Sequence, residues 1–386
     1  MKRNKNSNIV IGILFVVVLA GSAVQAASAA DGYHFVRSWG EAGADDGEFS
    51  SPVGVAVYGT GNVYVLDNAS PRVQVFTRDG GYITQWGGSG SGTSQFSNPM
   101  GIAVRSDGTV FVADTGNDRV QRFAANGSFL NGWGTHGTGQ SQFSTPRAIG
   151  ACLGSMLVID DRIQRFMPDG SFVATWGGAG SENGLFAQPE GIAVNSVRTV
   201  YVADTKNNRV QEFLPNGTLV TVWGSYGTGE GDFRNPTGIA VDSAGNIYVT
   251  DTGNSRIQKF GPHGAFIKEW GTNGSGPGEF SSPKGIAVDS DGNVYVADTG
   301  NNRIQKFAPG DPTVIAVPPG TSPPTDTNVD GIRDDVNGNG RADFEDIVLY
   351  FNQMTWIAAN EPMAAFDCNG NSRIDFADVT WLFNHL

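Results

Sequence analysis

A repeated pattern, F-x-x-P-x-G, constrains the fold of this chain more than any other feature of its sequence. Five exact copies and a sixth with Ala148 in place of the glycine occur in 386 residues, and successive copies start 47, 47, 43, 47 and 47 residues apart. The copies begin at Phe49, Phe96, Phe143, Phe186, Phe233 and Phe280. Each repeat holds four short strand-like runs separated by glycine-rich turns, which is typical of propeller blades. We therefore expect an all-β fold, a six-bladed β-propeller.

The strands of a blade can be placed from these runs. In the last repeat GIAV predicts the innermost strand, NVYVAD the second and RIQKF the third, and GAFIKEWG of the repeat before it predicts an outermost strand. The last repeat stops at Phe307 without an outermost strand, whereas GYHFVRSWG at 32–40 is a strand without a blade. We expect this N-terminal strand to close the ring, because closure removes an open sheet edge.

The third repeat departs from the pattern. Its segment CLGSMLVIDDRIQRF, at 152–166, is shortened around the first two strands and lacks the T-G-N-N turn. We expect blade 3 to leave a gap on one face of the propeller.

The repeat consensus, P-x-GIAVD followed by GNVYVADTxNxRIQxF, resembles the NHL repeat family over residues 33 to 308. The resemblance implies a propeller that binds ligands where its central channel opens. Some NHL-like propellers are lyases that hold a metal through several histidines. None of the four histidines here, His34, His136, His263 and His385, occupies a corresponding repeat position. The sequence therefore predicts no catalytic residue, although it leaves open whether any catalysis occurs.

The variable residue of P-x-G should surround the mouth of that channel. Around the ring it is Val53, Met100, Arg147, Glu190, Thr237 and Lys284. These six residues are the candidate ligand-binding set, and three of them would give the mouth a mixed charge.

Three Asp-Thr-Gly triplets look like the active-site motif of aspartic proteases, which pair two such carboxylates. Here the aspartate recurs in five repeats, and an arginine always follows five residues later. The pairs are Asp67 and Arg72, Asp114 and Arg119, Asp204 and Arg209, Asp251 and Arg256, and Asp298 and Arg303. Across a hairpin turn the two side chains would meet, so we predict structural ion pairs.

Residues 1–30 have the order of a signal peptide, with a basic start, an apolar run and small residues before a cleavage site. We expect a secreted or cell-surface protein with no stable membrane span after cleavage. A net charge of −13 opposes nucleic-acid binding. The propeller should occupy 31–308, followed by a proline-rich linker at 309–325 and a small domain at 326–386.

Two loops of twelve residues in the small domain, DVNGNGRADFED and DCNGNSRIDFAD, place oxygen ligands at the spacing of calcium-binding loops. The predicted Ca²⁺ ligands are Asp335, Asn337, Asn339, Arg341, Asp343 and Asp346 in the first loop. In the second loop they are Asp367, Asn369, Asn371, Arg373, Asp375 and Asp378. Each arginine would contribute its backbone carbonyl. Ser372 replaces the usual glycine at position 6, so the second loop should bind calcium less well.

A terminal pair of loop-helix units, with aspartate at position 12 of each loop, resembles a dockerin. The resemblance implies docking to a cohesin-like module or cell-surface scaffold through loop positions 10 and 11 and the following helix. Those positions are Phe344, Glu345, Phe376 and Ala377.

The sequence favours a non-enzymatic exported binding protein, with a recognition face for a protein or glycan ligand and a calcium-dependent tail for attachment. The alternative is a dockerin-tethered extracellular enzyme, of carbohydrate-active or lyase type. The sequence identifies neither the ligand, nor the docking partner, nor the oligomeric state.

Overall fold

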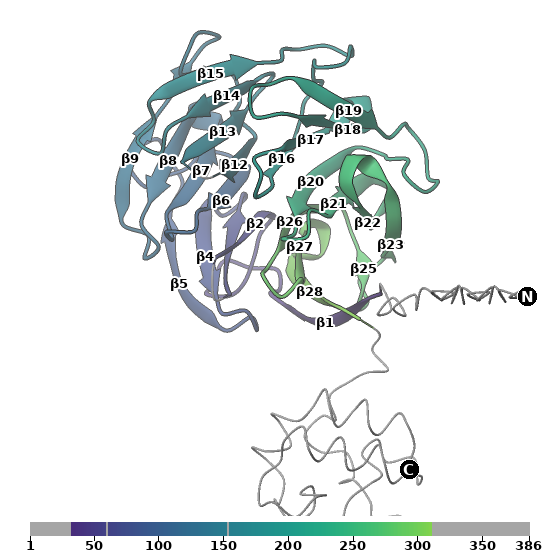
Figure 1. Ribbon diagram of the computed structural model, residues 1–386. Coiled ribbons are helices and arrows are strands. Elements are labelled where there is room, and N and C mark those ends of the chain that lie inside the picture. Colours follow the sequence, from purple (N-terminus) through teal and green to yellow (C-terminus); the bar gives the residue numbers. More distant parts are fainter. Residues whose placement is uncertain (1–31, 59–60, 153, 311–386) are drawn as a thin grey trace, which may run out of the picture.

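The computed structural model describes residues 32–58, 61–152 and 154–310. Strands in this part of the chain form six four-stranded antiparallel sheets. Figure 1 shows them as blades around a central axis, with the first strand of each blade innermost. The predicted six-bladed propeller is confirmed. The predicted signal peptide, the small C-terminal domain and nearly all of the linker lie outside the described residues.

The blades follow one another along the chain. Blade 1 contains β2 (Pro52–Tyr58), β3 (Asn62–Asp67), β4 (Arg72–Phe76) and β5 (Tyr82–Gly87), and blade 2 contains β6 (Gly101–Val104), β7 (Val110–Asp114), β8 (Arg119–Phe123) and β9 (Phe129–Trp133). Blade 3 contains β12 (Ala148–Cys152), β13 (Ser155–Ile159), β14 (Ile163–Phe166) and β15 (Phe172–Trp176), and blade 4 contains β16 (Gly191–Val194), β17 (Val200–Asp204), β18 (Arg209–Phe213) and β19 (Leu219–Trp223). Blade 5 contains β20 (Pro236–Val241), β21 (Ile247–Asp251), β22 (Arg256–Phe260) and β23 (Phe266–Trp270). Blade 6 contains β26 (Pro283–Val288), β27 (Val294–Asp298) and β28 (Arg303–Pro309), with β1 (Tyr33–Trp39) as its outermost strand.

The remaining elements are short. Two parallel pairs lie between blades: β10 (Thr135–His136) with β11 (Gln142–Phe143), and β24 (Thr272–Asn273) with β25 (Glu279–Phe280). Single 3₁₀ turns are η1 (Thr115–Asn117), η2 (Thr205–Asn207), η3 (Thr252–Asn254), η4 (Pro262–Gly264) and η5 (Thr299–Asn301). Within the described ranges, no helix is long and apolar enough to cross a membrane.

Blade 6 is assembled from both ends of the propeller. Strand β1 pairs antiparallel with β28, from Tyr33 opposite Pro309 to Trp39 opposite Ile304. The Gly310 amide then donates to the Gly32 carbonyl at 2.8 Å. The ring of Tyr33 also stacks on Trp270 of blade 5, with centroids 4.6 Å apart. The predicted N-terminal closure of the ring is confirmed.

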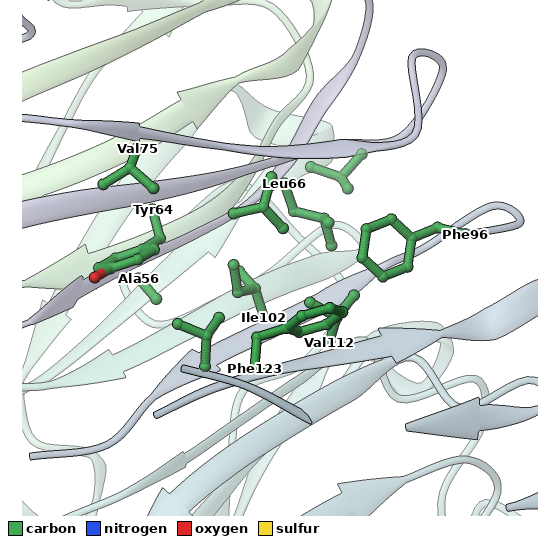
Figure 2. Close-up of a cluster of buried hydrophobic side chains, with 11 residues drawn as sticks. Ala56, Tyr64, Leu66, Val75, Phe96, Ile102, Val112 and Phe123 are labelled. Atoms are coloured by element: carbon green, nitrogen blue, oxygen red, sulfur yellow. The ribbon is translucent and has the colours of Figure 1, made fainter. Parts of the chain in front are cut away.

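The core lies between neighbouring blades. Figure 2 shows the cluster between blades 1 and 2, where Leu66 and Tyr64 face Ile102, Val112 and Phe123. The phenylalanine that opens each repeat is fully buried in such a cluster; these are Phe49, Phe96, Phe143, Phe186, Phe233 and Phe280. Burying each of these rings stabilises the fold by about 1.5 to 3 kcal/mol. This explains why phenylalanine recurs at the repeat start.

The Asn-Gly and Asp-Gly turns between third and outermost strands serve two purposes. Gly127 has a φ of +84° and Gly217 a φ of +87°, as the hairpin geometry requires. A Cβ at Gly127 would also lie 2.7 Å from the ring of Trp86, at the end of the outermost strand of the preceding blade. The tryptophan near the end of each of these outermost strands, Trp86 and Trp176, therefore packs against a turn of the next blade.

Blade 3 is shortened at both of its first two connections. Strands β12 and β13 pair as far as Cys152 and Ser155, whereas β6 and β7 of blade 2 pair only as far as Val104 and Val110. The connection is therefore one residue shorter in blade 3, because two residues separate Cys152 from Ser155, whereas three separate Arg105 from Thr109, whose backbone groups are hydrogen-bonded in blade 2. Between β13 and β14, Asp160 and Arg162 take the place of the longer Asp-to-Arg turn.

Candidate ligand site at the channel mouth

The paired aspartates and arginines hold the loops that lead into the channel. Asp298 is fully buried, and the Arg303 Nε lies 2.8 Å from its Oδ2. Arg303 Nη2 donates to the Gly276 carbonyl at 2.8 Å and to the Glu279 carbonyl at 2.9 Å. Those carbonyls belong to the loop that enters the innermost strand of the same blade. The ion pair thus fixes the backbone that presents Lys284 at the mouth.

The predicted pairs form in all five blades, with one weaker than the others. The Asp-to-Arg distance is 2.7 Å in blade 2 and 2.8 Å in blades 4, 5 and 6. In blade 1, Arg72 Nε is 3.8 Å from Asp67 Oδ2. Blade 3 has a shortened version of the pair, in which Arg162 Nε is 4.0 Å from Asp160 Oδ1.

The two weaker pairs also differ in their electrostatics. Burial raises the pKa of Asp67 above its ordinary value, and hydrogen bonds from Ser50 and Ser51 and the charge of Arg72 offset this only in part. Burial likewise raises the pKa of Asp160. A buried carboxyl group is less stable in its ionised form when no guanidinium lies close to it.

Two further residue types complete this framework, and the sequence analysis missed both. An asparagine three residues after the aspartate and a glutamine seven residues after it donate to the same carboxylate. In blade 6 Asn301 Nδ2 and Gln305 Nε2 lie 2.9 and 3.0 Å from Asp298 Oδ2. The signal was available, because both residues recur at fixed offsets in the repeats.

In five of the six blades glycine follows the variable residue, and Ala148 takes its place in blade 3. The glycine is needed where the innermost strands approach each other closely. A Cβ at Gly238 would lie 2.2 Å from the Lys284 carbonyl of the next blade, and one at Gly191 would lie 2.1 Å from the Thr237 carbonyl. A side chain at this position would push neighbouring blades apart. The glycines therefore set the narrow width of the channel.

All six predicted mouth residues line one recess at the start of the innermost strands. It has a volume of about 80 Å³ and is lined by Val53, Met100, Arg147, Glu190, Thr237 and Lys284, with the backbone that follows each. The structure therefore brings the whole candidate set together. Whether they bind a ligand is a separate question.

The mouth has an apolar side and a polar side. Blades 1 and 2 contribute Val53, which is buried, and Met100. Blades 3 and 4 contribute Arg147 and Glu190, whose Nη1 and Oε1 atoms are 4.0 Å apart. On blade 5 the Thr237 hydroxyl lies 2.7 Å from that of Thr252. Lys284 of blade 6 makes no ion pair within the described part of the chain.

The histidines lie elsewhere. His34 is on β1, His136 contacts Asp118 at 3.0 Å, and His263 contacts Glu212 at 3.0 Å. Among the described residues, no group of three His, Cys, Asp or Glu side chains is placed to hold a metal ion. His385, all twelve predicted calcium ligands from Asp335 to Asp378, and the predicted docking residues Phe344, Glu345, Phe376 and Ala377 lie outside the described residues.

The repeat itself matches a known family model. The model described as NHL repeat matches residues 96–123, 186–213, 233–260 and 280–307, which belong to blades 2, 4, 5 and 6. Four of the six blades therefore match the NHL repeat. The four matched NHL blades are those with the short Asp-to-Arg distance. A comparison with curated proteins finds no match for the chain.

Solved structures with the same fold are distant in sequence. A structural genomics protein of unknown function from Bacteroides thetaiotaomicron is 18% identical, with a TM-score of 0.58, over 72% of this chain and 76% of that chain. A structure titled streptogramin B lyase is 16% identical, with a TM-score of 0.51, over 72% of this chain and 98% of that chain. At this level of identity these similarities establish the fold alone.

Proposed function

We propose that this protein is an exported, non-enzymatic binding protein that recognises a protein or glycan ligand at the channel mouth of its propeller. Its C-terminal region would attach it, with calcium, to a cohesin-like module or a cell-surface scaffold. The proposal is carried by one observation: the six residues that vary between repeats converge on a single small recess.

The size of this recess favours binding of a projecting group. Pockets that enclose a small-molecule ligand usually measure about 300 to 1,000 Å³. The recess at the mouth measures about 80 Å³, which is room for a side chain or a sugar substituent. The remainder of such a ligand would lie across the surrounding loops.

The chemistry of the mouth supports the same proposal. Arg147, Glu190 and Thr237 offer charges and a hydroxyl on one side, and Met100 offers an apolar contact on the other. Polar groups of this kind fix the orientation of a ligand, and the apolar side contributes contact area. The mouth thus suits a ligand that has both polar and apolar groups, as protein loops and glycans do.

The mouth proposal can be tested with the protein lacking residues 1–30. This protein would be screened on glycan and peptide arrays, and each ligand found would be titrated against Arg147→Gln/Lys284→Gln. A matched variant, Arg37→Gln/Lys268→Gln, removes the same charge from the outermost strands β1 and β23. We expect at least about a tenfold loss of affinity for the mouth variant alone, since charge-assisted contacts contribute more than 1.4 kcal/mol.

Two results would count against this function. Equal affinity for both double variants would remove the mouth as the binding site. Chemical conversion of a bound ligand would instead support the tethered-enzyme alternative.

The attachment proposal rests on the two calcium-type loops in the sequence. Their carboxylates would repel one another without a cation, so folding of this region should be coupled to calcium binding. Calorimetric titration of the protein should reveal two calcium sites of unequal affinity. Asp335→Ala should weaken calcium binding and docking more than Asn371→Ala, because a carboxylate contributes charge that an amide lacks. Docking that is unchanged in excess chelator would contradict both the calcium assignment and the dockerin resemblance.

A further inference from the structure

A second recess lies at the opposite end of the innermost strands from the mouth. It has a volume of about 330 Å³, against about 80 Å³ for the mouth. Its lining comes from the ends of three innermost strands and from the turns that follow two of them, namely Val104, Arg105, Ser106, Ala151, Val194, Asn195 and Ser196. These residues belong to blades 2, 3 and 4, so the recess is centred on blade 3.

Two departures of blade 3 from the repeat create this space. Ala151 stands where the neighbouring innermost strands end in Val104 and Val194, so two methyl groups are missing. The connection after it is one residue shorter than in blade 2, because two residues separate the paired Cys152 and Ser155, whereas three separate Arg105 from Thr109, whose backbone groups are hydrogen-bonded. The other three residues missing from the 43-residue spacing are absent from the turn between Asp160 and Arg162, at the mouth end of the blade.

The polar groups of the recess are mainly hydrogen-bond donors. The side chain of Arg105 is 19% exposed, and its Nη1 lies 3.3 Å from Asp107 Oδ2. Within the described residues its other N–H groups have no partner, although a guanidinium can donate five hydrogen bonds. The Asn195 Oδ1 already accepts from the amides of Val197 and Thr199, at 3.1 and 2.8 Å.

The rest of the recess is aliphatic. Val104, Ala151 and Val194 form its floor, and Val197 on the adjoining turn is 74% exposed. An exposed aliphatic side chain beside an apolar floor offers additional area for contact with an apolar ligand. The recess thus places a cation at one side of an aliphatic surface.

We propose that this recess binds a small aliphatic carboxylate. The carboxylate would accept from the free N–H groups of Arg105 and from the hydroxyls of Ser106 and Ser196, while the alkyl chain would contact Val104, Ala151 and Val194. A volume of about 330 Å³ is within the range of small-ligand pockets. This site is separate from the proposed recognition face.

The existing ion pair does not prevent such binding. Asp107 is 49% exposed, and an exposed ion pair contributes only about 0 to 1 kcal/mol. A planar guanidinium can also bind two carboxylates through different N–H groups. Arg105 can therefore accept a ligand while it remains beside Asp107.

The test uses 4-methylpentanoate as the probe and 4-methylpentanamide as its neutral isostere, titrated into the protein by calorimetry and ligand-observed NMR. We expect saturable binding of the carboxylate and at least about tenfold weaker binding of the amide, because the amide loses the charge-assisted contact. Arg105→Gln should weaken carboxylate binding by a similar factor. Arg147→Gln, at the opposite end of the channel, should leave it unchanged.

A second variant tests the location independently of charge. Ala151→Val restores the residue of the neighbouring blades, so the variant should fold, and it should weaken binding by filling the floor. Circular dichroism and thermal melting would verify that both variants are folded. Absence of saturable binding, equal binding of acid and amide, or full binding by folded Ala151→Val would each overturn the proposal.

Discussion

The most repeated interaction of the molecule is a buried carboxylate that receives four hydrogen bonds. In blade 6 the Ser281 amide donates to Asp298 Oδ1 at 2.7 Å, and Asn301, Arg303 and Gln305 donate to its Oδ2. A buried charge is tolerated only when it is paired and hydrogen-bonded in this way. In blades 2, 4, 5 and 6 the carboxylate therefore has a structural role that uses both of its oxygens.

Asp298→Asn should lower the free energy of unfolding by about 1 to 3 kcal/mol, because Arg303 loses the charge that balances it. Urea unfolding would measure the change. Asp161→Asn provides a control, since Asp161 is exposed and next to the corresponding position of blade 3. An Asp298→Asn protein with wild-type stability and no ligand binding would instead revive a catalytic role for this aspartate.

Gly238→Ala should destabilise the propeller by about 1 to 3 kcal/mol, since the added methyl would overpack the contact between two innermost strands. The new Cβ would lie 2.2 Å from the Lys284 carbonyl. Gly261→Ala is the matched control, because a Cβ there would meet its nearest atom at 3.6 Å. Thermal melting of both variants would compare them, and equal melting temperatures would contradict the close-approach argument.

The sequence predicts only some of the side-chain contacts that these aspartates make. The Asp-to-Arg pairs follow from their constant offset and from the geometry of a hairpin, which brings the ends of a short turn together. From the sequence alone, Asn301 can be explained as a turn residue and Gln305 as a polar residue of a strand. Their convergence on Asp298 depends on side-chain directions that only the folded hairpin defines.

Among the elements, β1 has the most distant partner in sequence. Without it, the edge of β28 from Arg303 to Pro309 would be unpaired, and such an edge promotes aggregation. Strand β1 also contributes Tyr33 and Phe35, which pack against the cluster between blades 5 and 6.

Deletion of residues 32–40 should lower the melting temperature of the propeller and increase its aggregation. Light scattering during a thermal ramp would record both effects. A synthetic peptide of residues 32–40 should restore the melting temperature, whereas a scrambled peptide should not. Unchanged melting and solubility after the deletion would refute closure by β1.

Blade 3 separates what the sequence predicts about a blade from what only the structure reveals. The missing T-G-N-N turn and the short spacing predict an irregular blade with a gap. They do not predict the recess, which depends on Ala151, Arg105 and Asn195 coming together from three blades. The NHL model likewise matches neither blade 1 nor blade 3 in the residues it reports.

At the scale of the whole molecule, a variable position on the third strand links two of the blades to the next one. Lys306 Nζ lies 3.1 Å from Asp79 Oδ1 in blade 1, and Glu212 lies 3.0 Å from His263 in blade 5. Beside the first of these contacts, Arg78 Nη2 of blade 1 lies 3.1 Å from Asp289 Oδ2 of blade 6. The ring is thus closed by ion pairs as well as by β1.

Asp289 should make ring closure sensitive to acid. Burial would raise its pKa, but hydrogen bonds from Asn293, then Arg78 and Tyr295, outweigh burial and hold the pKa below 3.8. The Asp289 carboxylate therefore binds a proton more readily in the unfolded chain than in the folded protein. The stabilisation is complete above the unfolded value of about 3.8 and is lost as the pH falls through the folded pKa.

The stability difference between wild type and Asp289→Asn should accordingly be larger at about pH 7 than at about pH 3. Urea unfolding of both proteins at each pH would measure it. Asp291→Asn, which removes the exposed partner of the same arginine, should cost less stability at about pH 7. A difference that grows on acidification would contradict the assignment.

The pairing of β1 with β28 also has a consequence in time. The contact between His34 Nδ1 and the Gly310 carbonyl oxygen spans 276 residues. At a synthesis rate of about 5 to 20 residues per second, β1 leaves the ribosome about 14 to 55 s before its partner strand exists. The entropy of loop closure rises only slowly with loop length, so the long sequence separation between β1 and β28 costs little stability in the folded protein. It does mean that the ring cannot close before β28 has been synthesised, and that the speed of synthesis sets how long β1 stays unprotected.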